Sequence, residues 1–267
     1  MEIVYRLGEA NALGNLGSAY YSLGQYQQAI NHHQQTLDIA REIGDRNGEG
    51  GSLCNIGNVY QSLSQYQQAI DFYSKALPIQ REVGNQKFEA NSLIGLGNTY
   101  NSLEEYQPAI DFYQQSLEIK REIGDRQGEA TSLGNLGIAY RSLGQYQQAI
   151  DFHQQSLDIA REIGDRRGEA ITLINLGNAL AKTDQKWDAQ SSYEAARSLY
   201  QALDLPKKVE KCETAIRDLG KVIVEVRNSA PTIGDEAPMA RKRRRIPLIV
   251  WVVVGLVAVL LIGWLLL

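Results

Sequence analysis

The feature that most constrains the fold of this chain is a sequence unit that recurs every 40 residues. Copies begin at Gly8, Gly48, Phe88, Gly128 and Gly168, and the copies at Gly8 and Gly128 are nearly superimposable. A fixed period of this length is typical of solenoids, in which each unit covers the apolar face of its neighbour. We therefore expect one small structural unit to be stacked repeatedly along most of the chain.

Each unit contains two stretches of helical periodicity separated by a turn. In the first stretch, Leu13, Leu16 and Tyr20 share one helical face, and residues 26–40 repeat the pattern. Gly24 lies between the two stretches and can adopt the left-handed conformation that ends a helix. Each unit is therefore predicted to be a helical hairpin. The five hairpins are expected at residues 8–47, 48–87, 88–127, 128–167 and 168–205.

The large and small residues of the unit stand at the spacing of the tetratricopeptide repeat. That spacing is carried by Leu16, Gly17, Tyr20, Gly24, Tyr26 and Ala29, and again by Leu136, Gly137, Tyr140, Gly144, Tyr146 and Ala149. The array resembles the longer variant of this repeat found in Leu-Gly-Asn (Pins-like) proteins and kinesin light chains. The resemblance implies an all-α fold, a right-handed α-solenoid whose first helices form a concave wall that holds an extended peptide.

The segments around the five hairpins differ in character. Residues 1–7 align with the end of a unit and are interpreted as the remnant of a preceding repeat. Residues 206–227 form an amphipathic pattern that predicts a capping helix over the last hairpin. Residues 228–245 contain prolines and a glycine and are interpreted as a flexible linker that ends in a basic cluster.

Residues 246–267 carry no charge and would span about 33 Å as a helix, enough to cross a hydrocarbon core. This segment is predicted to be a transmembrane helix, whereas a buried core helix is the less favoured alternative. The residues expected at the membrane interface are the basic cluster and two aromatic residues: Arg241, Lys242, Arg243, Arg244, Arg245, Trp251 and Trp264.

The basic cluster also suggests an orientation. The net charge is -4, and the cluster contributes +5, so the rest of the chain carries -9 (-4 minus 5). Basic residues beside a membrane span favour the cytoplasmic side and anionic lipid head groups over a nucleic-acid partner. The expected arrangement is a single-pass, tail-anchored protein with its array in the cytoplasm, bound to lipid through the helix and the basic cluster.

Residues that could support catalysis or metal binding are few. Cys54 and Cys212 are the only cysteines and lie far apart in the sequence. His33 and His153 occupy a column that holds tyrosine, such as Tyr73, in other units, so we interpret them as packing residues. No catalytic residue, metal or cofactor is predicted, and the chain is not expected to be an enzyme.

One polar stripe on the first helices suggests function. It is offset from the packing face, and stacked hairpins would align it from unit to unit. A carboxamide can both donate to and accept from a peptide backbone, and basic residues at the rim could pair with acidic side chains. The alternative is that these amides only hold neighbouring hairpins together. The predicted groove residues are Asn11, Asn15, Asn55, Asn58, Asn91, Asn98, Asn135, Arg141, Asn175, Asn178 and Lys182.

These patterns together predict a membrane-tethered adaptor that binds a protein or peptide partner in a concave groove. The alternative function is a structural scaffold on the membrane, built by self-association of the arrays. This alternative follows from the unit at the start of the array, whose apolar side chains have no preceding hairpin to cover them.

Overall fold

The computed structural model describes the backbone of residues 2–229 and the side chains of residues 2–221, and residues 1–224 form one compact unit. Eleven α-helices make up this described part, which contains no β-strand. They are α1 (Glu2–Ser22), α2 (Tyr26–Glu42), α3 (Arg46–Ser62), α4 (Tyr66–Glu82), α5 (Gln86–Ser102), α6 (Tyr106–Glu122), α7 (Arg126–Ser142), α8 (Tyr146–Glu162), α9 (Arg166–Leu180), α10 (Lys186–Ala202) and α11 (Pro206–Ser229).

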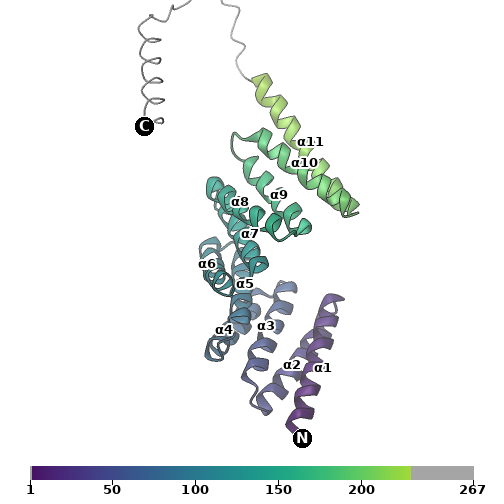
Figure 1. Ribbon diagram of the computed structural model, residues 1–267, viewed down its shortest axis with the longest axis vertical. Coiled ribbons are helices and arrows are strands. Elements are labelled where there is room, and N and C mark those ends of the chain that lie inside the picture. Colours follow the sequence, from purple (N-terminus) through teal and green to yellow (C-terminus); the bar gives the residue numbers. More distant parts are fainter. Residues whose placement is uncertain (1, 230–267) are drawn as a thin grey trace, which may run out of the picture. The chain divides into compact units, whose positions relative to one another are not determined.

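Helices α1 to α10 form five antiparallel hairpins that follow one another along the array (Figure 1). Each odd-numbered helix packs against the even-numbered helix that follows it, and each even-numbered helix packs against the first helix of the next hairpin. The all-α solenoid that the 40-residue period predicts is therefore confirmed.

The turns between hairpins explain the recurring Gly-Asp pair of the unit. Gly44 has a φ of 72°, the left-handed conformation that ends a helix without a steric penalty for glycine. Asp45 then caps α3, because its carboxylate accepts a 2.9 Å hydrogen bond from the Gly48 N–H. The same glycine and cap recur before α7 and α9, so one short sequence ends a hairpin and begins the next.

Inside each hairpin, a large ring of the second helix packs against a glycine of the first. A Cβ atom added at Gly57 would lie 2.8 Å from the Tyr73 ring, closer than carbon atoms can approach. Tyr73 is fully buried as a result, and Tyr113, Tyr193, His33 and His153 occupy the same position in the other hairpins. The glycine column thus allows close packing of the two helices.

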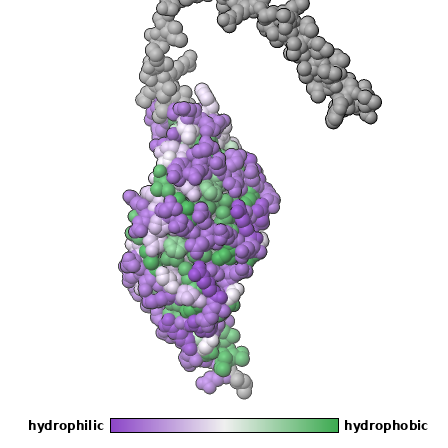
Figure 2. All heavy atoms as spheres, turned by 90° about the vertical axis from the view of Figure 1, so that its left-hand side faces the viewer, coloured by the Kyte–Doolittle hydropathy of each residue, from purple (hydrophilic) through white to green (hydrophobic). Residues whose placement is uncertain are grey.

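The N-terminal residues belong to α1 rather than to the end of a preceding helix. Residues 2–7, interpreted above as the remnant of a repeat, form the first turns of α1. Val4 and Tyr5 replace the Gly44-Asp45 turn of the next unit, so the helix continues through this position. Ile3, Val4 and Tyr5 are 65%, 75% and 75% exposed. Apolar side chains gather at this end of a face that is otherwise largely hydrophilic (Figure 2).

Helix α11 packs on the last hairpin. Cys212 and Leu219 are buried in one cluster with Tyr200, and Val209, Ala215 and Ile216 pack against that cluster. The sequence pattern placed these same α11 residues on one side of a helix.

Residues 230–267 lie outside the described residues, and with them lie the predicted basic cluster and the predicted transmembrane helix at 246–267. Within the described part, no helix is both long enough and apolar enough to cross a membrane.

Candidate binding groove and the Ala160 pocket

The polar stripe lies on the helices that line the inner side of the array. Contacts link α1 to α3, α3 to α5, α5 to α7 and α7 to α9 directly, whereas comparable contacts between second helices do not occur in the described part. The first helices are therefore closer together than the second helices. This arrangement gives the array an inner side that is lined by first helices.

Three asparagines of the stripe bond to the second helix of their own hairpin. The carboxamide oxygens of Asn58, Asn98 and Asn178 accept hydrogen bonds of 2.7, 2.7 and 2.9 Å from the hydroxyl groups of Tyr73, Tyr113 and Tyr193, respectively. Each bond satisfies the hydroxyl of a buried tyrosine. These three asparagines therefore have a structural role, and only their half-buried amide ends are free to face a ligand.

Hairpins one and four lack this hydrogen bond, because both residues that form it are replaced there. Ser18 and Ile138 replace the asparagine where His33 and His153 replace the tyrosine. Neither nitrogen of His153 has a hydrogen-bond partner in the described part of the chain. Burial lowers the pKa of both imidazoles to about 4, so both are neutral at physiological pH. They act as packing rings, not as proton-transfer groups.

The other predicted residues of the stripe differ in exposure. Asn11, Asn15, Asn91 and Lys182 are exposed, whereas Asn55, Asn135, Asn175 and Arg141 are half-buried. The Asn91 oxygen accepts a 3.1 Å hydrogen bond from the Lys120 ammonium. The Asn135 amide donates to the Asn98 oxygen of the preceding hairpin at 3.4 Å. Each first helix from α1 to α9 thus carries at least one asparagine of the stripe, and two of these asparagines, Asn91 and Asn135, also form hydrogen bonds to neighbouring residues.

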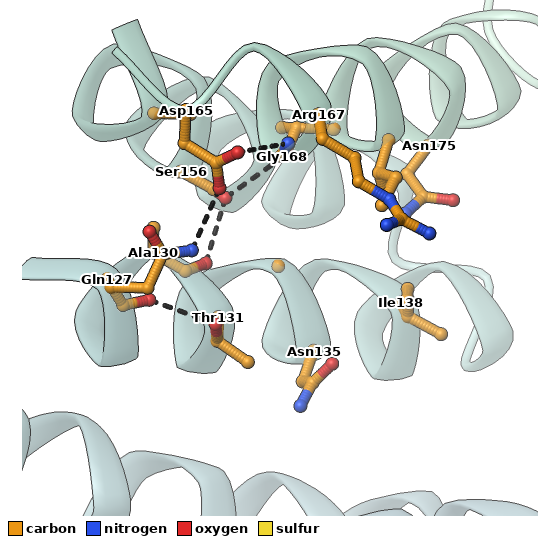
Figure 3. A pocket seen from close by; sticks show the side chains of 14 residues that line it. Gln127, Ala130, Thr131, Asn135, Ile138, Ser156, Asp165, Arg167, Gly168 and Asn175 are labelled. Carbon is orange, nitrogen blue, oxygen red and sulfur yellow. Dashed lines mark hydrogen bonds between the residues drawn. The ribbon is translucent and has the colours of Figure 1, made fainter. Parts of the chain in front are cut away.

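A pocket of about 280 Å³ opens on this stripe between hairpins four and five. We call it the Ala160 pocket. Its walls come from α7 and α9 and its floor from α8, where Ser156 and Ala160 lie (Figure 3). Its other lining residues are Gln127, Ala130, Thr131, Gly134, Asn135, Ile138, Asp165, Arg167, Gly168, Ile171, Thr172 and Asn175. It thus brings together two predicted groove residues, Asn135 and Asn175.

Most of the residues that line the pocket are not among the predicted groove residues. Ser156, Ala160 and Arg167 were not predicted, although they line the same pocket as Asn135 and Asn175. A partial signal was present at position 160, where alanine stands in a column that holds Gln80, Lys120 and Tyr200 in three other hairpins and Ala40 in the first. The loss of a large side chain between hairpins that carry Lys120 and Tyr200 leaves space at that junction.

Basic side chains on the inner side of hairpins four and five are unpaired. Within the described residues, no carboxylate forms an ion pair with Arg141, Arg167 or Lys182. The Nε atom of Arg141 is buried without a hydrogen-bond partner there. By contrast, Arg121 and Arg161 pair at 2.9 and 2.8 Å with Glu129 and Glu169 of the next hairpin. Within the described part, no three His, Cys, Asp or Glu residues cluster in a way that could hold a metal ion.

Comparison with known sequences decides the family. Residues 4–42, 48–122 and 124–202 match the family model of the tetratricopeptide repeat. The chain belongs to the tetratricopeptide repeat family. As a tetratricopeptide array, it has the architecture of a protein-interaction scaffold. No protein with a curated description matches the chain.

Several solved structures are similar to this chain in fold. BtubC from P. vanneervenii is 21% identical, with a TM-score of 0.66 over 76% of this chain and 90% of that chain. Kinesin-light-chain-like repeats from P. anserina are 19% identical, with a TM-score of 0.61 over 73% and 95%. A Rap protein complexed with Competence and Sporulation Factor is 14% identical, with a TM-score of 0.67 over 82% and 65%. At these identities the similarity establishes the fold.

Proposed function

We propose that this tetratricopeptide protein is a non-catalytic adaptor that binds an extended segment of a partner protein along the inner side of its first helices. The observation that carries this proposal is the recurrence of asparagine on every first helix, and two of these asparagines, Asn135 and Asn175, line a pocket between hairpins four and five. Asn175 is half-buried at the pocket wall, and its amide makes no hydrogen bond within the described residues. Such a group can pair with the backbone of a peptide irrespective of the peptide sequence.

The Rap structure supports a peptide-binding role by analogy. That Rap protein was crystallised in complex with Competence and Sporulation Factor, so a protein of similar fold binds a partner. We propose that this chain also binds a peptide or protein ligand.

We further propose that the array is held at a membrane. Residues 246–267 are uncharged and long enough to span a bilayer, and five consecutive basic residues precede them. The positive charge favours a single-pass arrangement with the array in the cytoplasm and contacts from the basic cluster to anionic lipid. Alkaline carbonate extraction of the full chain from cells tests this part, because a protein without a membrane span would be released.

The groove is tested by quantitative capture of partners from a detergent extract. The full chain is compared with the variants Asn135→Ala and Asn175→Ala, and with Gln148→Ala, which changes an exposed residue of α8. The groove variants are expected to lose the same partners about tenfold while the α8 variant retains them, since central interface residues dominate affinity. Equal recovery by all variants with unchanged circular dichroism would exclude the groove as the binding surface.

A second candidate function is a self-associating scaffold, which the exposed apolar start of α1 favours. Ile3, Val4 and Tyr5 are at least 65% exposed, and contiguous apolar surface of this kind often marks an interaction site. Mass photometry of the full chain in detergent, with and without Val4→Lys, measures this directly. A concentration-dependent oligomer that Val4→Lys dissociates would support the scaffold, and a monomer at all concentrations would reject it.

A further inference from the structure

The junction between hairpins four and five is open because a residue that fills the equivalent junction is missing. Between hairpins three and four, the buried Lys120 side chain lies against Gly128, and its ammonium donates to Asp125 at 2.8 Å and to Asn91 at 3.1 Å. The equivalent of Lys120 in hairpin four is Ala160, which is too short to reach these positions. The Ala160 pocket occupies the space that Lys120 fills one hairpin earlier.

A second small residue deepens the same pocket. Gly134 lines it from α7, whereas Ile94 and Ile174 stand at the equivalent positions of hairpins three and five. A Cβ atom at position 134 would be 3.6 Å from the Ser156 hydroxyl, an ordinary contact distance. The backbone at this point therefore does not require glycine, and the packing of the two helices would tolerate a larger residue.

The interior of the pocket suits an apolar side chain. The Ser156 hydroxyl donates to the Ala130 carbonyl at 2.9 Å and lies 3.3 Å from the Thr172 hydroxyl, so the polar atoms of the floor already have partners. Ile138 and Ile171 form apolar walls, and Ile171 is 46% exposed although it lines a concave surface. A volume of about 280 Å³ is at the small end of binding pockets and fits one large side chain.

The rim of the pocket is positively charged. Arg167 lines it, Arg141 lies on the same helix as Ile138, and Lys182 follows α9. Glu129 and Glu169 are the only carboxylates of α7 and α9, and both are paired with arginines from the preceding second helices.

Asp165, the remaining carboxylate at the pocket, also has hydrogen-bond partners. Its two oxygens accept hydrogen bonds from the Gly168 N–H at 2.8 Å and from the Gln127 amide at 2.9 Å. These bonds keep the pKa of its carboxyl below the usual range. Asp165 therefore stays ionised with both oxygens engaged. The positive charge of Arg167 also contributes to the low pKa of Asp165, but the two side chains form no hydrogen bond within the described residues, so the Arg167 guanidinium can still pair with an incoming carboxylate (Figure 3).

We propose that the Ala160 pocket selects partner segments in which a large aliphatic side chain lies within two residues of an aspartate or glutamate. The aliphatic side chain enters between Ile138 and Ile171, and the carboxylate pairs with Arg167 at the rim. The Asn175 amide, at the pocket wall, binds the backbone between them. This inference rests on the proposed groove function and specifies the class of sequence that the groove takes.

The test is a selection from a random twelve-residue peptide library displayed on phage, against the full chain in lipid nanodiscs. The expected result is enrichment of peptides that contain an aliphatic residue near an acidic one. Synthetic copies of the enriched peptides are then titrated against variants by fluorescence anisotropy.

The chain itself supplies matched variants. Gly134→Ile and Ala160→Gln introduce the residues that hairpins three and two carry at these positions, and they are expected to weaken binding at least about tenfold. Gly14→Ile and Ala40→Gln make the same changes in hairpin one and serve as controls. At the junction of hairpins one and two, Ser18 and Gly51 replace the two isoleucine walls, so these variants should leave binding unchanged. Arg167→Gln, which copies Gln127, should reduce binding about fivefold and remove the preference for an acidic residue.

Each outcome separates this inference from the proposed function. Enriched peptides whose binding survives Gly134→Ile and Ala160→Gln but is lost in Asn135→Ala and Asn175→Ala would overturn the pocket while leaving the groove intact. Enrichment without any aliphatic and acidic pair would overturn the pocket in the same way. Peptides insensitive to all of these variants, or no enrichment over an empty nanodisc, would overturn both.

Discussion

The hydroxyl group of Tyr113 donates a 2.7 Å hydrogen bond to the carboxamide oxygen of Asn98, an asparagine that also accepts from Asn135 of the next hairpin at 3.4 Å. One buried tyrosine of α6 is thereby connected through α5 to α7. Asn98, one of the predicted groove residues, thus links hairpins three and four.

This bond predicts a measurable coupling between the two residues. Asn98→Ala leaves a buried hydroxyl without a partner and should lower the free energy of unfolding by about 1–3 kcal/mol, whereas Tyr113→Phe should cost about 1 kcal/mol. The double variant should lose about 1 kcal/mol less free energy of unfolding than the sum of the losses of the two single variants. Urea unfolding followed by circular dichroism measures all three, with exposed Asn11→Ala as the control. If the losses of the two single variants simply add in the double variant, the hydrogen bond makes no contribution to stability.

The buried histidines predict loss of stability in mild acid. Their pKa is about 4 in the folded chain and about 6.5 in the unfolded chain, so unfolding takes up protons between these values. The full contribution of His33 and His153 is present above pH 6.5 and is lost as the pH falls towards 4. Each histidine should account for up to about 3 kcal/mol.

A swap taken from the chain itself tests this assignment. His153→Tyr together with Ile138→Asn reproduces the bonded pair of Tyr193 and Asn178. The double variant should lose about half of the pH dependence between 6.5 and 4, and His153→Tyr alone should be less stable because its hydroxyl faces Ile138. An unchanged slope of unfolding midpoint against pH would contradict the assignment.

Three turns of the described part carry a non-glycine residue in a conformation that favours glycine, and two of these turns, at Ser64 and Glu104, lie within hairpins. Ser64 and Glu104 have φ values of 58° and 63°, whereas Gly24 and Gly144 occupy the equivalent turns of hairpins one and four. Because a left-handed conformation costs a residue with a Cβ atom about 1–2 kcal/mol, Ser64→Gly and Glu104→Gly should each raise stability by about 1 kcal/mol. The reverse change, Gly144→Ser, should lower the melting temperature, and a rise there would refute the explanation.

Lys120 is predicted to stabilise the junction between hairpins three and four. Lys120→Ala removes its buried stem and its bonds to Asp125 and Asn91, and should cost about 1–3 kcal/mol. The Lys120 ammonium, and to a smaller extent the Gly128 N–H, hold the pKa of the Asp125 carboxyl below 3.8. This pKa should therefore rise in Lys120→Ala. Nuclear magnetic resonance titration measures this shift. Lys75→Ala, which removes an exposed ion pair to Asp71, should change stability by less than about 1 kcal/mol.

The sequence predicted the hairpins because their determinants are local and repeated. The columns of Leu16, Gly17 and Tyr20 define helical faces, and Gly44 and Asp45 define the turns. The start of α1 was not predicted, because alignment assigned residues 1–7 to the remnant of a preceding repeat, whereas α1 begins at Glu2 and continues through Val4 and Tyr5.

The site was predicted only in part. The stripe of asparagines follows from helical geometry, but its hydrogen bonds to tyrosines depend on how two helices meet. Lys120 illustrates the limit, because a lysine in a polar sequence context is expected at the surface and here is 3% exposed. The pocket follows from comparing Lys120 with Ala160, which becomes meaningful once the junction is known.

The open space beside Ala160 also has a mechanical meaning. Repeats of this kind contact only their neighbours, so the stiffness of the array is set junction by junction. The junction beside Ala160 lacks the hydrogen bonds that Lys120 donates to Asp125 and Asn91 one hairpin earlier. A side chain inserted beside Ala160 would contact α7 and α9 at once, so a ligand in this small pocket would couple the movement of hairpins four and five.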